Sequence, residues 1–280
     1  MNHSLQSIVE QLAGKTNRQR RIIIRDYLHS LEVPFHEQEF CLGHHANVLV
    51  DLAGENQQSK RLLLSAHYDA VPGSPGANDD ASAVAVLLGV VEEFRNVPSP
   101  FPLRIAFFDA EESGLKGSRE YVKQYGTKDL TAVLNLEMVG RGSLPVYWPV
   151  ARQTSEYQRI LLHAAEMPSL INYHHGHSGD HQSFQEAGMR DSVSLTLIDE
   201  RDRPLLKEIR ERLAQPNQVN LLEMQQKIND SYTFRNYHQP TDTADQIEEE
   251  SLQIAKNLVL KVIDGFAERY DQQPVALTSL

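Results

Sequence analysis

Short apolar runs that alternate with amphipathic segments constrain the fold of this chain most strongly. Arg61–Ala66 and Leu103–Phe108 have the length and apolar content of buried strands, whereas Arg18–Leu31 repeats its apolar residues at helical spacing. Further strands are predicted at Phe35–Leu42, Asn47–Leu52, Ala132–Leu136, Leu144–Trp148 and Ser192–Ile198, and further helices at Ser7–Ala13, Ala81–Phe94, Leu115–Tyr125, Glu156–Ala165, Gln182–Ala187 and Ser251–Tyr270. Strands that alternate with helices indicate an α/β fold with helices on both faces of the sheet.

The segment Arg203–Ile228 interrupts this alternation. Apolar residues recur at helical spacing before and after Pro216, which predicts two short amphipathic helices. Such a pair could form a lid, an oligomer contact or an αα-hairpin on the flank of the domain. A length of 280 residues without repeats or low-complexity linkers is compatible with one large domain. We expect a single domain over residues 1–280, with a helical insertion at about residues 200–230.

The composition excludes several classes of partner. A formal net charge of -11 disfavours nucleic acid and anionic membranes. The single cysteine, Cys41, cannot form an intramolecular disulfide. The first residues lack the basic start and apolar run of a signal peptide, and the most apolar stretch, Ala81–Val91, is too short to span a bilayer. We therefore predict a cytoplasmic protein; the sequence does not indicate its oligomeric state.

Five metal-ligating side chains lie at or just after predicted strands or in adjoining loops. They are His67, Asp79, Glu112, Glu137 and His238. Ligands usually bind at the carboxyl ends of strands in α/β sheets, and imidazole and carboxylate groups suit zinc and related divalent ions. Five ligands exceed the needs of one tetrahedral ion. They suffice for two ions if one carboxylate bridges them.

Each of these residues also has an ordinary structural interpretation. The Glu111–Glu112 pair could mark a solvated helix start, or one glutamate could bind a metal while its neighbour moves a proton. Asp79 or Asp80 could cap the helix that begins at Ala81. His67 and Asp69 are two residues apart, so in a strand they point the same way and Asp69 can orient the imidazole.

The sequence motifs that contain these residues resemble those of the M28 family of co-catalytic zinc aminopeptidases. The matching motifs run in family order from about residue 61 to residue 245. They are Ser65-Ala66-His67-Tyr68-Asp69, Pro75-Gly76-Ala77-Asn78-Asp79-Asp80-Ala81-Ser82, Ala110-Glu111-Glu112-Ser113-Gly114-Leu115-Lys116-Gly117-Ser118, Asn135-Leu136-Glu137-Met138-Val139-Gly140, Gly179-Asp180-His181 and His238-Gln239-Pro240-Thr241-Asp242.

The resemblance implies a role for each candidate residue. His67 and Glu137 would bind one zinc ion, Glu112 and His238 a second, and Asp79 would bridge the two. The implied catalytic residues are Glu111, the general base that passes a proton from the attacking water to the leaving amine, and Asp69, which orients His67. Asp180 would lie near Glu111, and Tyr237 would line the cleft. The implied fold is a three-layer α/β/α sandwich around a mixed, mainly parallel sheet.

Two departures from the family pattern concern the site. The family more often has Asp where Glu137 stands, and Arg203–Ile228 is longer than in the smallest members. The His-rich loop 174–181 also suggests metal binding by composition, although the family motif covers only its end. We interpret His174, His175 and His177 as ordinary loop residues.

The predicted function is hydrolysis of the N-terminal peptide bond of a peptide with a free amino end, using water activated by two zinc ions. The alternative is a glutaminyl cyclase with one zinc ion, which forms N-terminal pyroglutamate on a similar scaffold. Such cyclases commonly have Trp before the last ligand, where this chain has Tyr237. A non-catalytic, receptor-like relative is disfavoured because neither a ligand nor the base is missing.

Overall fold

The computed structural model describes residues 4–55, 60–148, 155–166, 178–213 and 221–271. Its strands are β1 (His36–Phe40), β2 (His45–Leu52), β3 (Arg61–His67), β4 (Leu103–Phe108), β5 (Leu130–Leu136), β6 (Leu144–Trp148) and β7 (Ser192–Ile198). Its α-helices are α1 (Leu5–Leu12), α2 (Asn17–Ser30), α3 (Ser82–Phe94), α4 (Lys116–Tyr125), α5 (Glu156–Ala164), α6 (His181–Glu186), α7 (Arg203–Leu213), α8 (Leu221–Asn229) and α9 (Glu249–Asp271). The predicted helices and strands are all present, with ends that differ by a few residues.

The strands of the described residues form one sheet in the order β1-β2-β4-β3-β5-β7-β6. The four central strands, β4, β3, β5 and β7, pair in parallel. The pairs β1–β2, β2–β4 and β6–β7 are antiparallel. The predicted mixed sheet is therefore confirmed, with a parallel centre and antiparallel pairs toward the two edges.

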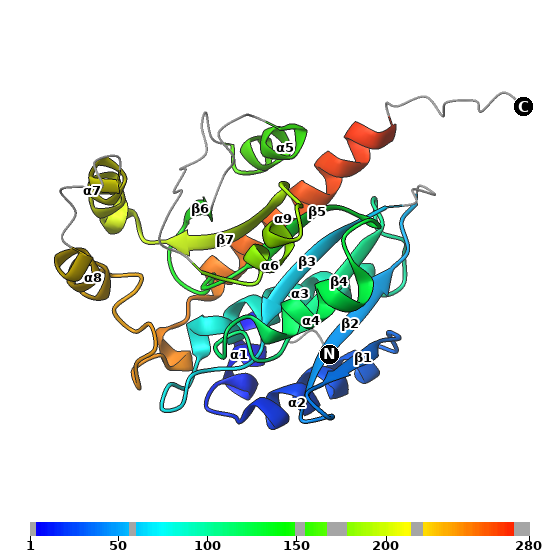
Figure 1. The fold of residues 1–280 in the computed structure, drawn as a ribbon, viewed down its shortest axis with the longest axis horizontal. Coiled ribbons are helices and arrows are strands. Elements are labelled where there is room, and N and C mark those ends of the chain that lie inside the picture. The colour runs from blue at the N-terminus through cyan, green and yellow to red at the C-terminus, as the bar shows by residue number, and fades with distance from the viewer. Residues whose placement is uncertain (1–3, 56–59, 149–154, 167–177, 214–220, 272–280) are drawn as a thin grey trace, which may run out of the picture.

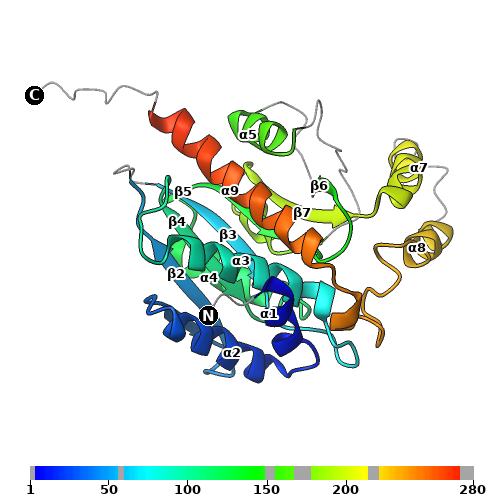
Figure 2. The same ribbon diagram turned by 180° about the vertical axis from the view of Figure 1, so that it is seen from behind.

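Helices cover both faces of this sheet (Figures 1 and 2). Leu62 and Leu64 point into a large core shared with α1, α2, α3, α5 and α9. Leu63, on the opposite face of β3, joins Tyr121 of α4 and Phe184 of α6 in a second core. This alternation along a strand places one helical layer on each side, because successive strand residues point to opposite faces. The three-layer α/β/α sandwich is confirmed.

Helices α2 and α3 illustrate how the sequence defines local structure. Thr16 and Gln19 form a capping box in which each side chain bonds the other residue's backbone N–H, and this fixes the start of α2. In α3, every residue from Ser82 to Val91 is buried. A helix without a polar face lies in the core, which explains why it packs under the sheet between α1 and α9.

The insertion predicted at about residues 200–230 contains α7 and α8. Leu206 and Ile209 of α7 pack with Val146 of β6 and Ile198 of β7, and Ile228 of α8 lies against the same cluster. This packing places both helices against the β6–β7 side of the sheet. Among the helices of the described residues, none combines the length and the apolar composition needed to cross a lipid bilayer.

Candidate metal centre

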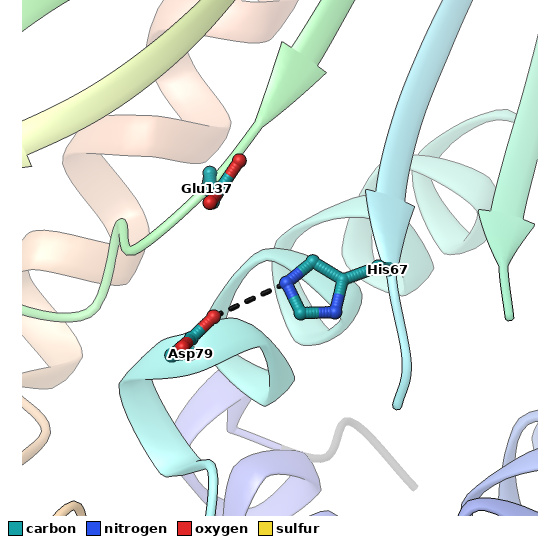
Figure 3. A group of neighbouring side chains, drawn as sticks. All are labelled: His67, Asp79 and Glu137. Atoms are coloured by element: carbon teal, nitrogen blue, oxygen red, sulfur yellow. Dashed lines mark hydrogen bonds and ion pairs between the residues drawn. The ribbon is translucent and has the colours of Figure 1, made fainter. Parts of the chain in front are cut away.

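Three parallel strands bring the first candidate residues together at the carboxyl-terminal end of the sheet. His67 is the last residue of β3, and Glu137 directly follows β5. Glu111 and Glu112 lie in the loop after β4. Strand β3 pairs in parallel with both β4 and β5, so the carboxyl ends of the three strands meet. Figure 3 shows His67 and Glu137 at the ends of neighbouring strands, with Asp79 facing them from a helical turn.

Asp79 presents its two carboxylate oxygens to two different imidazoles. Its Oδ1 lies 3.1 Å from Nε2 of His67, and its Oδ2 lies 3.2 Å from Nε2 of His238. Within the described part of the chain, three groups of side chains could hold an ion: His67, Asp79 and Glu137; Asp79, Glu112 and His238; and His67, Glu111 and Glu112. The first two groups share Asp79. The two oxygens of Asp79 therefore face two different groups of candidate ligands.

The distances within the second group are slightly shorter than those between ligand atoms around a bound cation. The Nε2 of His238 lies 3.1 Å from Oε2 of Glu112 and 3.2 Å from Oδ2 of Asp79. Ligand atoms about 2.0–2.2 Å from a tetrahedral zinc ion lie roughly 3.3–3.6 Å apart. The Oε1 of Glu112 is buried without a hydrogen-bond partner among the described residues. Convergent donors with unused capacity fit a divalent ion between them.

The ionisation of these groups shows that the site favours positive charge. Contacts with Asp79 and Glu112 raise the pKa of His238 to about 10. Burial alone would lower the pKa of His67, but Asp69 and Asp79 beside it raise that pKa well above its ordinary value. Burial alone would raise the pKa of Asp79, but the two imidazoles hold it below its ordinary range. A bound cation would supply the positive charge that the protonated imidazoles otherwise provide.

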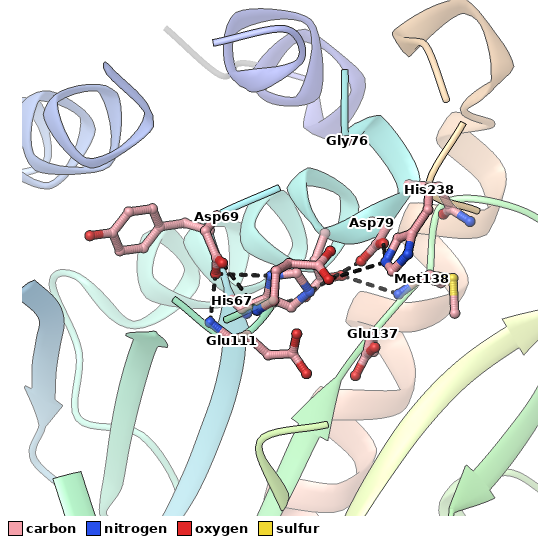
Figure 4. A network of polar contacts seen from close by, with 12 residues as sticks. His67, Asp69, Gly76, Asp79, Glu111, Glu137, Met138 and His238 are labelled. Carbon is pink, nitrogen blue, oxygen red and sulfur yellow. Dashed lines mark hydrogen bonds and ion pairs between the residues drawn. The ribbon is translucent and has the colours of Figure 1, made fainter. Parts of the chain in front are cut away.

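Asp69 connects His67 to the glutamate pair. Its Oδ1 lies 3.4 Å from Nδ1 of His67 and accepts the backbone N–H of Glu111 at 2.9 Å, while its Oδ2 accepts the backbone N–H of Glu112 at 3.1 Å (Figure 4). Asp69 is 2% exposed, so water does not compete for these contacts. One carboxylate thus fixes both the imidazole ring and the loop that carries the glutamates.

Glu111 lies beside the candidate ligands His67 and Glu112 but is not needed to complete either of the two groups that share Asp79. Burial is the main cause that raises the pKa of Glu111 to about 10, and the carboxylates of Glu137, Asp180 and Glu112 add to it. Burial likewise raises the pKa of Asp180 to about 7. Asp180 immediately precedes α6 and is fully buried. His174, His175 and His177 lie outside the described residues.

Tyr237 stacks on the imidazole of His238. The ring centroids are 3.8 Å apart and the planes are inclined by 26°. Burial raises the pKa of Tyr237, and Asp79, Glu137, Glu112 and Glu111 raise it further. The phenol therefore stays protonated and lies close to the carboxylates, where it can donate a hydrogen bond.

The capping interpretation of Asp79 and Asp80 is wrong. Both have non-helical backbone angles in the turn Ala77–Ala81, and the N-cap of α3 is Ala81, which makes no side-chain capping bond. Asp80 instead accepts the backbone N–H of His67 at 3.3 Å and that of Met138 at 3.1 Å. It therefore ties the end of β3 to the end of β5. Its place beside Asp79 was the only sequence signal for this role.

Asp242 also shapes the site, a role that the sequence pattern alone did not reveal. Its carboxylate accepts the backbone N–H of Asn78 at 2.9 Å and that of Asp79 at 3.1 Å. It stands four residues after His238 and is 1% exposed. Asp242 thus joins the loop of one imidazole to the turn that carries the shared carboxylate.

Unusual backbone angles are found at the centre. Ala110, Met138 and His238 have φ values of 60°, 53° and 58°, in the left-handed region that residues other than glycine seldom adopt. Each residue either precedes or follows a candidate site residue, or is one. Such conformations persist where surrounding contacts hold them, and they concentrate at functional sites.

Comparison with known proteins gives a consistent result. The model of peptidase family M28 matches residues 47–263. Aminopeptidase YwaD of Bacillus subtilis is 31% identical over 219 residues, which cover 72% of this chain and 40% of that protein. A vacuolar membrane protease of Vanderwaltozyma polyspora is 30% identical over 152 residues, which cover 52% of this chain and 16% of that protein. The chain therefore spans less than half the length of these curated relatives.

Solved structures share the fold. BSAP, a zinc aminopeptidase from Bacillus subtilis, superposes with a TM-score of 0.57 at 29% identity, covering 78% of this chain and 49% of that chain. A glutaminyl cyclase from an Acidobacteriales bacterium superposes with a TM-score of 0.65, covering 95% and 94% of the two chains. At 19% identity the cyclase shows the fold alone. Since the family model covers most of this chain, the chain belongs to peptidase family M28.

Proposed function

We propose that this protein is a metal-dependent aminopeptidase that hydrolyses the N-terminal peptide bond of peptides at a centre with two zinc ions. His67 and Glu137 hold one ion, Glu112 and His238 hold the other, and Asp79 bridges them. The observation that carries the proposal is that Asp79 directs Oδ1 to His67 and Oδ2 to His238. Membership of peptidase family M28 and the likeness to the zinc aminopeptidase BSAP support a zinc-dependent aminopeptidase.

Imidazole and carboxylate ligands suit zinc in a hydrolytic centre. When bound, zinc polarises the scissile carbonyl and makes water more acidic at neutral pH. Each ion would have one imidazole, one terminal carboxylate and a share of Asp79. Asp69 holds His67 in one ring orientation through the contact at Nδ1, so that Nε2 faces the site.

Glu111 moves the proton. It takes the proton of the water that attacks the carbonyl carbon and delivers it to the amine as the carbon–nitrogen bond breaks. Because burial raises the pKa of Glu111 to about 10, its basic form depends on positive charge in the site. Asp69 fixes the backbone of Glu111 by the 2.9 Å bond, so the carboxyl group keeps its position during both transfers.

The substrate is a peptide with a free amino end. The centre is rich in carboxylates, which attract an ammonium group and repel a carboxylate. Tyr237 offers a hydroxyl donor beside His238 for a substrate oxygen. The cytoplasmic location expected from the sequence remains a prediction.

One experiment separates peptidase from cyclase. Elemental analysis would count zinc per chain, and the same sample would be assayed with aminoacyl-anilides and with a peptide that begins with glutamine. We expect two ions per chain and anilide hydrolysis that chelation abolishes. One ion per chain with pyroglutamate formation would replace the aminopeptidase by the cyclase.

A matched pair of variants tests the bridging carboxylate. Asp79→Asn retains the size of the side chain but weakens its oxygen ligands, so we expect fewer than two ions per chain and loss of hydrolysis. Asp245→Asn, the same change at an exposed position, should leave both unchanged. Two tightly bound ions in Asp79→Asn would contradict the bridging role.

A further inference from the structure

Arg20 of α2 is a fully buried cation next to the candidate metal centre. Its exposed fraction is 0%, and it lies outside residues 47–263, the part of the chain that the family model matches. Its guanidinium donates from Nη1 to the carbonyl oxygen of Tyr68 at 3.2 Å. It also donates from Nη2 to the carbonyl oxygens of Pro75 at 2.5 Å and Gly76 at 3.0 Å.

These carbonyl groups flank two candidate ligands. Tyr68 directly follows His67, and Gly76 precedes the turn Ala77–Ala81 that carries Asp79 (Figure 4). One guanidinium therefore connects the end of β3 to the start of that turn. A planar fork with several donors suits this connection, whereas an ammonium is a point charge on a flexible stem.

Asp242 also holds this turn. While Arg20 binds the carbonyl of Gly76, Asp242 accepts the backbone N–H groups of Asn78 and Asp79. The turn is thus hydrogen-bonded both to a buried cation and to a buried carboxylate. Its backbone is fixed at Gly76, at Asn78 and at the shared candidate ligand, Asp79.

Packing alone does not explain an arginine at this position. A buried charge is expensive, and an apolar side chain would avoid that cost. Among the described residues, no carboxylate makes an ion pair with Arg20, and its Nε has no hydrogen-bond partner. Burial lowers the pKa of Arg20, and Asp79, Asp69, Asp242 and Asp80 raise it from a greater distance. The direct partners of the guanidinium are the carbonyl groups.

Gly76 provides the room for this contact. Its φ is +60°, and a Cβ at this position would lie 2.7 Å from Nη2 of Arg20. A side chain at residue 76 would therefore displace the guanidinium. The arginine and the glycine form one local arrangement.

We propose that Arg20 is a positioning residue for the metal centre, because its hydrogen bonds fix the turn that carries Asp79 relative to the strand end that carries His67. The N-terminal segment before the family-matched region thereby sets the spacing of two ligands. This inference rests on the proposed function, since it needs the centre to bind zinc.

Two effects of removing Arg20 have opposite signs, which makes the role testable. Loss of its charge leaves the site more negative and would tighten zinc binding. Loss of its hydrogen bonds frees the turn and weakens binding. Removal of groups that orient metal ligands typically lowers metal affinity about 10–100-fold, and we expect this positional effect to prevail.

The experiment measures zinc affinity of the metal-stripped full chain by competition with a chromophoric chelator. Arg20→Met removes both charge and hydrogen bonds, and Arg20→Lys keeps the charge without the fork. Both should bind zinc about 10–100-fold more weakly than the wild type. With cobalt(II) in place of zinc, both should also show shifted visible bands, which report ligand geometry rather than fold stability.

Arg104→Met is the matched control. Arg104 is a largely buried arginine that binds Asp51 and Tyr121 near the start of β4, at the opposite end of that strand from the metal centre. Its loss should destabilise the fold. Zinc affinity should stay within about threefold of the wild-type value, and the cobalt spectrum should be unchanged. Circular dichroism of each metal-free variant would verify folding, and Arg20→Lys remains informative if Arg20→Met does not fold.

The outcomes distinguish this inference from the proposed function. Equal or tighter zinc binding in Arg20→Met or Arg20→Lys, with the wild type binding two ions, would overturn the positioning role alone. A wild type that binds no zinc would overturn the proposed function, and this inference with it.

Discussion

The carboxylate of Asp69 accepts the backbone N–H of Glu111 at 2.9 Å, while it also lies 3.4 Å from the imidazole of His67. In the proposed centre, a residue that contacts neither substrate nor ion therefore couples a proposed zinc ligand to the proposed general base. The two are 44 positions apart in the chain, and a single buried side chain sets their relation.

We predict that Asp69→Asn lowers both zinc affinity and kcat/KM by about 10–100-fold. The amide has one oxygen in place of two, so it cannot accept the N–H groups of Glu111 and Glu112 together and also fix His67. Zinc titration and steady-state kinetics on an aminoacyl-anilide would measure both effects. Asp26→Asn, at an exposed position, is the control, and wild-type values in Asp69→Asn would refute this coupling.

Glu111→Gln should retain its metal and lose at least about a hundredfold in kcat, the usual scale for removing a proton-transfer group. Glutamine keeps the backbone bond to Asp69 but cannot take up a proton. Zinc content and turnover should be measured on one preparation. Glu186→Gln, at an exposed site, controls for the change in charge. Near-normal turnover in Glu111→Gln would remove this residue from the mechanism.

Leu88→Ala should lower the free energy of unfolding by about 2–5 kcal/mol, because Leu88 is 0% exposed in α3 and its loss leaves a cavity. Leu42→Ala makes the same chemical change at a side chain that is 100% exposed, and should stay within about 0.5 kcal/mol of the wild type. Urea unfolding of the metal-free protein measures both. Equal effects at the two positions would contradict the packing of α3.

Asp51→Asn should reduce stability at neutral pH and matter less in acid. Arg104 and Arg61 hold the pKa of Asp51 below its ordinary value despite partial burial. A carboxylate with a lowered folded-state pKa stabilises the fold above its unfolded pKa, and this contribution fades as the pH falls through the folded value. The difference in urea midpoint between variant and wild type should be constant from about pH 8 to 6 and narrow below about pH 5. A difference that widens in acid would be inconsistent with the ion pairs.

Much of the fold follows from local patterns in the sequence. The alternation of apolar runs with amphipathic segments predicted the strands and helices, because burial on a sheet or on one helical face requires those periods. His67 and Glu137 were recognisable because each ends or follows an apolar run, where a charged group needs a partner. The order of the strands and the antiparallel outer pairs could not be predicted from these patterns, because pairing between strands depends on contacts distant in sequence.

The sequence by itself determined which residue types are available at the strand ends, and with them the chemistry of zinc and of a carboxylate base. Only the tertiary structure decided that Asp79 divides its oxygens between two imidazoles, and that Asp80 joins two strands instead of capping α3. It also revealed that Arg20, in an amphipathic helix far from the motifs, is buried and donates hydrogen bonds to the carbonyl groups just before the turn that carries Asp79. The physical reason is that hydrogen bonds and metal ligands require atomic positions fixed to within about an ångström. Such positions arise only when segments distant in sequence pack together.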